Sequence, residues 1–181
     1  MDRKFTPIVS VIGIAALSGG PAHADEFSAR LNGFNEVGGL GAGETGAILT
    51  NGNGTLRLDF DHKTITYTLT FAELTSAATQ AHIHFGKVHV AGGIMAWLCQ
   101  SATKPSPTSG TPTCPAGGGT VTGTLNPASV VAISGQNVTA GDFDALSDAL
   151  TSNTAYANVH TVNFPAGEIR GQVRGANREN E

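Results

Sequence analysis

Three histidines in two short segments are the residues of this chain best suited to metal chemistry. His82 and His84 are separated by one residue in AHIHFG, and His160 lies in YANVHTVNF. Side chains two residues apart on a β-strand share a face, so the first two imidazoles point in the same direction. Imidazole nitrogens are common ligands of copper and zinc. The alternative interpretation is that these are polar residues on a solvated sheet face.

The same alternation turns the third histidine away from the core. Asn158 and His160 alternate with two small apolar residues that suit a core. We therefore predict that the three histidines converge on one outer face of the domain and bind a single copper or zinc ion. His89, in a glycine-bounded loop, is a further candidate ligand. The alternative is that the imidazoles hydrogen-bond to loop backbone and hold the covering segments in place.

A second polar row follows the turn at Phe164–Gly167. Glu168, Arg170 and Gln172 alternate with smaller or apolar residues on the predicted strand 168–173. We expect Glu168 and Arg170 to form a structural ion pair that fixes the strand register, with Arg170 mainly structural. The alternative is that Arg170 attracts an anion toward the histidines.

Strand patterns dominate the rest of the chain. Alternating residues and frequent turns predict roughly eight or nine short strands in an all-β sandwich or Greek-key barrel. A further short strand is expected at Ala47–Thr50, and Asp142–Leu150 has a cap and apolar spacing typical of one short helix. The clearest strands are predicted at residues 27–31, 56–60, 65–71, 81–85, 93–99, 120–125 and 156–160.

The first residues have the layout of a signal peptide. Arg3 and Lys4 precede an apolar stretch, and Ala22-His23-Ala24 offers small residues for cleavage. We therefore expect residues 1–24 to be removed, 25–174 to form one secreted or periplasmic domain, and 175–181 to be a polar tail. No later stretch is long enough to cross a bilayer. The net charge of −4 and the absence of a basic run argue against nucleic acid as a partner.

Cysteine use agrees with an extracytoplasmic chain. Cys99 and Cys114 are the two cysteines, and they flank the loop SATKPSPTSGTPT. A disulfide between them is expected in an oxidising compartment, whereas a pair of metal thiolates would need further ligands. We find no spacing typical of a Ser/His/Asp triad, a phosphate-binding loop or paired catalytic carboxylates, so no catalytic residue is predicted.

Several of these segments together resemble one family. AHIHFG, GGIMAWLC…TPTCP…GGTVTGTL and YANVHTVNFPAGEIRGQV are similar to the chordin-domain (CHRD) family over roughly residues 26–174. The resemblance implies a secreted or periplasmic protein and an immunoglobulin-like β-barrel that is distantly similar to Cu,Zn superoxide dismutases. His82, His84, His160 and Arg170 are similar in kind and order to the copper-site residues of those dismutases.

The resemblance to the dismutases covers the residues of their copper site but not those of their zinc site. The segment between His84 and Val121 lacks the further histidines and the aspartate that would bind zinc, and His89 is the one histidine there. Two functions are therefore expected. The first is a non-enzymatic CHRD binding module for an extracytoplasmic protein or envelope component. The alternative is a mononuclear copper- or zinc-binding protein for metal handling or redox chemistry.

Overall fold

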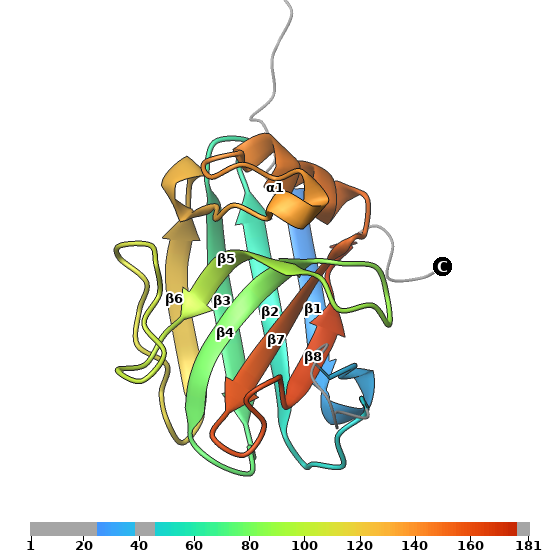
Figure 1. Ribbon diagram of the computed structural model, residues 1–181, viewed down its shortest axis with the longest axis vertical. Coiled ribbons are helices and arrows are strands. Elements are labelled where there is room, and N and C mark those ends of the chain that lie inside the picture. Colours follow the sequence, from blue (N-terminus) through green and yellow to red (C-terminus); the bar gives the residue numbers. More distant parts are fainter. Residues whose placement is uncertain (1–24, 39–45, 177–181) are drawn as a thin grey trace, which may run out of the picture.

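The computed structural model describes residues 25–38 and 46–176 (Figure 1). The predicted signal peptide and most of the predicted tail lie outside these residues. The described residues form nine strands, one α-helix and three short 3-10 helices. The strands are β1 Asp25–Asn32, β2 Asn53–Phe60, β3 Ile65–Ala72, β4 Ala78–Phe85, β5 Gly93–Cys99, β6 Gly119–Leu125, β7 Ala155–Thr161, β8 Ile169–Gln172 and β9 Arg174–Gly175; the helices are η1 Gly33–Asn35, η2 Pro127–Ser129, η3 Ser134–Gln136 and α1 Phe143–Thr151.

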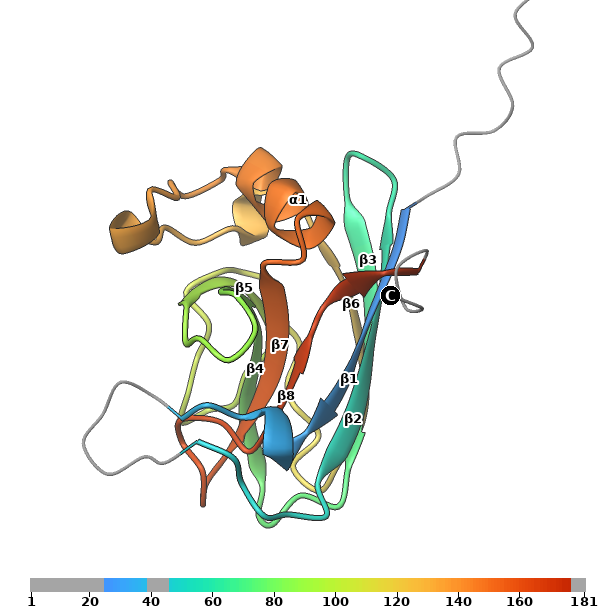
Figure 2. The same ribbon diagram turned by 90° about the vertical axis from the view of Figure 1, so that its right-hand side faces the viewer.

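The strands form one antiparallel sheet that curls into a nearly closed barrel. Their order is β5-β4-β7-β8-β1-β2-β3-β6, with β9 paired to β1. The two end strands, β5 and β6, approach each other. Figure 2 shows β4, β5 and β7 on one side of the barrel and β1, β2 and β3 on the other. The all-β prediction, a sandwich or barrel with one short helix, is therefore confirmed.

Alternation builds the core as the sequence predicted. Strands β2 and β3 form the expected hairpin, and their apolar residues face the barrel interior while the intervening threonines face outward. At its turn, Asp61 Oδ1 accepts hydrogen bonds from the backbone N–H groups of Lys63 (2.9 Å) and Thr64 (2.7 Å). Each fully buried large apolar side chain contributes about 1.5–3 kcal/mol. The buried residues of this hairpin are Leu56, Leu58, Phe60, Ile65, Tyr67, Leu69 and Phe71.

Helix α1 lies across one end of the barrel (Figure 2). The Asp142 side chain accepts a hydrogen bond from the backbone N–H of Ala145 at 3.0 Å, which satisfies one donor of the first turn. Leu146, Ala149 and Leu150 recur at helical spacing and are fully buried. The predicted helix is confirmed, one residue later than expected at each end.

The prediction of a strand at Ala47–Thr50 was wrong. Its backbone bonds to the η1 turn instead of a ladder, because Ala47 N–H donates to Glu36 O (2.6 Å) and Ile48 N–H donates to Gly33 O (2.7 Å). Ala47 also adopts a positive φ of 43°, which a regular strand does not allow.

The disulfide between Cys99 and Cys114 is confirmed. Cys99 is the last residue of β5, and both cysteines are buried in the hydrophobic core. The bond therefore ties the intervening loop to the barrel next to β4, because β5 pairs with that strand.

We predict that the free energy of unfolding is roughly 2–4 kcal/mol lower for the double variant Cys99→Ser/Cys114→Ser than for the native chain. The disulfide joins residues 15 positions apart, and the loop that it closes restricts the unfolded chain. Urea denaturation of both proteins measures this difference. Thiol labelling of the unfolded, unreduced native protein should find no free cysteine. Labelling of both thiols would contradict the prediction.

Candidate metal centre

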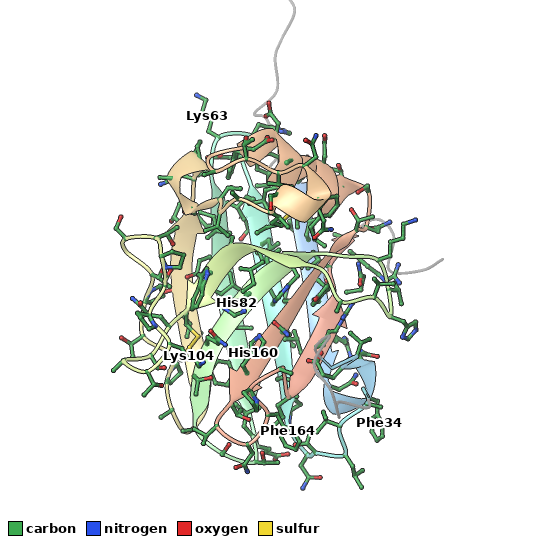
Figure 3. All side chains as sticks on the ribbon, viewed as in Figure 1. Phe34, Lys63, His82, Lys104, His160 and Phe164 are labelled. Carbon is green, nitrogen blue, oxygen red and sulfur yellow. A yellow bond between two sulfur atoms is a disulfide. The ribbon has the colours of Figure 1, made fainter. Side chains whose placement is uncertain are left out.

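Pairing between β4 and β7 brings the three histidines together. His82 lies opposite Asn158, and His160 lies opposite Gln80, so all three imidazoles project from the same face of adjacent strands. Their potential ligand nitrogens all lie within 4.8 Å of one another. Ring centroids are 4.9 Å apart for His82 and His160 and 5.3 Å apart for His82 and His84. Figure 3 shows His82 and His160 on these neighbouring strands.

The β4–β5 ladder is irregular at this point. Its register shifts between Ala81 and His82 and again between Ile83 and His84. Such bulges redirect side chains and are frequent beside functional sites. The extra residues, Met95 and Leu98, are on β5, whereas β4 keeps a regular register with β7 from Ala81 to Phe85, so the distortion lies in the strand opposite the two histidines.

The histidines face away from the core, as predicted, but they are not solvated. His82, His84 and His160 are 0%, 7% and 6% exposed. The other face of the same strands carries Ala81 and Val159, which belong to the hydrophobic core. Loops therefore cover the outer face of the sheet, and the interpretation of a wet sheet face was wrong.

Two of these covering segments hydrogen-bond to the imidazoles. His84 Nδ1 lies 2.9 Å from the carbonyl oxygen of Gly92, and His160 Nδ1 lies 2.9 Å from that of Pro165. A carbonyl oxygen can only accept, so the neutral His84 ring, whose Nε2 has no partner among the described residues, carries its proton on Nδ1 and its lone pair on Nε2. Metal-binding histidines are commonly oriented in this way by an acceptor on the other nitrogen.

The three imidazoles are unevenly supplied with hydrogen-bond partners. His82 Nδ1 lies 3.1 Å from His160 Nε2, which is also 3.0 Å from the acceptor Asn158 Oδ1, so His160 has an oxygen partner at either nitrogen. The Nε2 atoms of His82 and His84 are buried and have no hydrogen-bond partner in the described part of the chain. Leaving a buried polar atom unpaired costs about 1–3 kcal/mol. Metal–nitrogen bonds of about 2.0–2.1 Å place neighbouring ligand nitrogens about 3 Å apart. The nitrogens here lie within 4.8 Å of one another, so small side-chain movements would let the residues present fit an ion.

Burial keeps the imidazoles neutral. Desolvation lowers the pKa of His84 to about 4 and that of His160 to about 4, and it lowers the pKa of His82 well below its usual value. The neighbouring imidazoles lower the pKa of His82 further. All three are therefore unprotonated at pH 7, which is the form that binds metals.

These pKa shifts predict acid-sensitive stability of the metal-free protein. The unfolded histidines take up protons near pH 6.5, whereas the folded ones do so near pH 4, so the unfolded state binds more protons between these values. The free energy of unfolding should therefore fall as the pH drops from 6.5 to 4 and should not respond to these groups above 6.5. Each histidine contributes about 1.4 kcal/mol per pH unit in that window.

The prediction is tested by urea denaturation of metal-free protein between pH 7.5 and 4.5. His84→Gln should reduce the slope by about 1.4 kcal/mol per pH unit. Thr66→Ser, which changes an exposed side chain without a titratable group, should leave the slope unchanged. Equal slopes for the native chain and His84→Gln would contradict the assignment.

A stack of side chains extends from the histidines to Arg170. The Tyr156 ring lies parallel to His84, with centroids 4.7 Å apart and an interplanar angle of 5°. Arg170 Cζ lies 3.4 Å from the centroid of the same tyrosine. Two groups this close to one centroid would collide on a single face, so the ring is sandwiched between them. The Arg170 Nη2 also donates to the carbonyl oxygens of Lys87 (3.2 Å) and Val90 (3.0 Å).

A hollow of about 590 Å³ lies beside the histidine group. Its lining includes His84, Tyr156, Asn158 and Glu36. This hollow is the route by which an ion or small ligand could reach His84, the most exposed of the three histidines.

Comparison with known proteins agrees with this architecture. The family model of the CHRD domain matches residues 27–173. The chain belongs to the CHRD-domain family. No curated protein and no solved structure matches it. Within residues 25–38 and 46–176, none of the helices has the length and apolar character of a bilayer-crossing segment.

In the CHRD domain the side chains of Glu168 and Arg170 have different partners, so the expected ion pair between them is not formed. Glu168 is fully buried and accepts hydrogen bonds from the hydroxyls of Thr50 (2.7 Å) and Thr161 (2.8 Å) and from Thr75 N–H (2.8 Å) and Oγ1 (2.9 Å). Strand β8 begins only at Ile169, so the alternation that we extended to residue 168 does not apply there.

Two further residues differ from the sequence prediction. His89 is exposed and lines a separate hollow, so the structure does not bring it to the other histidines. Trp97 was not predicted to lie at the site. It lies opposite His82 in the β4–β5 register, with ring centroids 4.3 Å apart. Its position depends on strand pairing, and only the ordering of β5 next to β4 could have revealed it.

We predict that Arg170→Lys lowers the free energy of unfolding by about 1–3 kcal/mol, since lysine cannot both stack on Tyr156 and donate to two carbonyls. Arg174→Lys is the control, because Arg174 is exposed. Urea denaturation at pH 7.5 measures both. Equal stability of the two variants would show that Arg170 has no structural role.

Proposed function

We propose that this CHRD domain is an extracytoplasmic metal-binding module in which His82, His84 and His160 hold one copper or zinc ion. The observation that carries the proposal is the convergence of these buried imidazoles, two of which, His82 and His84, have a buried Nε2 without a hydrogen-bond partner among the described residues. A purely structural role would not require two buried Nε2 atoms without partners.

The ligand set favours copper. Three imidazoles suit both ions, and intrinsic affinity for nitrogen sites is higher for Cu(II) than for Zn(II). Bound copper would supply one-electron redox chemistry. The chain's own residues orient the ligands, exclude bulk water from His82 and leave His84 beside the adjoining hollow. No other group of three or more histidine, cysteine or acidic side chains in the described ranges is close enough to share an ion, which supports a single-ion site.

The basic and apolar layout of residues 1–24 supports an extracytoplasmic location, as does the disulfide. It stays a prediction that the domain also binds an extracytoplasmic protein or envelope component. Two exposed apolar side chains favour such a partner: Phe34 is 68% exposed and Leu49 is 86% exposed. They lie on adjoining segments, because Ile48 N–H donates to Gly33 O.

We predict that Cu(II) binds the metal-free protein at one site and quenches the fluorescence of its single tryptophan, because Trp97 contacts His82. Zn(II), a d¹⁰ ion without redox chemistry, should compete without strong quenching. His84→Gln should weaken copper binding by at least about tenfold, equivalent to 1.4 kcal/mol. His89→Gln is the matched control, since that exposed histidine lies outside the group.

Circular dichroism establishes that each variant is folded before titration. Electron paramagnetic resonance of the copper complex should show nitrogen coupling that is altered in His84→Gln and unaltered in His89→Gln. Equal affinity of the native chain and His84→Gln would mean that the histidines serve only to hold the covering loops.

A further inference from the structure

A second hollow, of about 460 Å³, is separate from the histidine group and is lined by three arginines. Arg30, Arg170 and Arg174 contribute to it together with His89 and the polar side chains of Asn35 and Gln172. No carboxylate is among its lining residues. This is a local concentration of positive charge in a chain whose net charge is −4.

Strand pairing explains why the arginines meet. Asn32 of β1 lies opposite Arg170 of β8, and Ser28 of β1 lies opposite Arg174 of β9. Arg30 lies between these two β1 positions and projects outward, since its neighbours Ala29 and Leu31 are buried. Three arginines that are distant in sequence are therefore held by backbone register around one hollow.

Arg170 is the buried and rigid member of this group. Its side chain is 2% exposed, and its Nη1 is buried with no hydrogen-bond partner among the described residues. The stack on Tyr156 and the two bonds from Nη2 hold the guanidinium in place. A guanidinium remains charged in proteins, so unpaired N–H groups at a buried position favour an anionic partner.

The carboxylate that acts on Arg170 electrostatically is Glu36, which lines the hollow beside the histidines and not this one. The three arginines are thus not neutralised by an acid within their own hollow. Arg30 and Arg174 are exposed and can adjust to a ligand, whereas Arg170 provides a fixed donor.

We propose that this hollow binds an oxyanion of the phosphate or sulfate class, with Arg170 at its buried side and Arg30 and Arg174 at its rim. Planar guanidinium groups match the oxygens of such anions with paired, charge-assisted hydrogen bonds. The volume exceeds that of a single phosphate and leaves room for an attached organic group. The proposal does not depend on metal binding, because the Tyr156 ring lies between Arg170 and His84.

The test is calorimetric titration of metal-free protein, at low ionic strength and pH 7.5, with inorganic phosphate and separately with glycerol 3-phosphate. We expect saturable binding of one anion, with affinity reduced about tenfold in Arg30→Gln and in Arg174→Gln, since each removes one charged contact. Both residues are exposed, so the variants should fold. Lys63→Gln, which removes one charge from the distant β2–β3 turn, is the matched control and should bind like the native chain.

Tighter binding of glycerol 3-phosphate would support an organic phosphate as the ligand, and equal binding would support a site that recognises the oxyanion alone. Absence of saturable binding would overturn the proposal. Equal weakening in Lys63→Gln and in the arginine variants would also overturn it, because general charge attraction would then account for the binding. Since no metal is present in this experiment, failure here leaves the copper titration as an independent result.

Discussion

The hydrogen bonds from two imidazoles to backbone carbonyls are the contacts on which the polar side of this barrel depends. His84 binds Gly92 and His160 binds Pro165, so each bond joins the sheet to a segment that covers it. The bond to Gly92 also determines that the neutral His84 ring keeps its lone pair on Nε2. For His84, one hydrogen bond therefore both holds the covering segment and leaves a buried lone pair on Nε2.

The loop between β4 and β5 contacts both the histidine group and the arginines of the CHRD domain. His84 and Tyr156 contact its end at Gly92, whereas Arg170 binds its carbonyls at Lys87 and Val90. Polar backbone of a buried loop must find partners, and here the side chains of the sheet provide them. The histidine group and the arginine hollow lie on either side of the Tyr156 ring and depend on the same covering segment.

The departures from the predicted pattern have a common cause. Glu168 precedes β8, so its side chain turns to three threonines from distant segments instead of joining Arg170. Residues 47–50 have strand-like composition, yet their backbone bonds to η1. In both cases alternation was applied to residues outside the regular strands. Period-two patterns hold only while the backbone stays paired on a strand.

The sequence by itself determined the barrel class, the core face of the strands with alternating residues, the helix at Asp142, the disulfide pair and the common direction of His82 and His84. Each of these follows from local alternation, capping or composition, which act between residues that are close along the chain. The tertiary structure alone decided that the histidines are buried, that His160 lies beside His82 while His89 does not, and that Arg30 joins Arg170 and Arg174. These outcomes depend on strand order and loop placement, because contacts between distant segments are set by sheet pairing and not by spacing in the sequence.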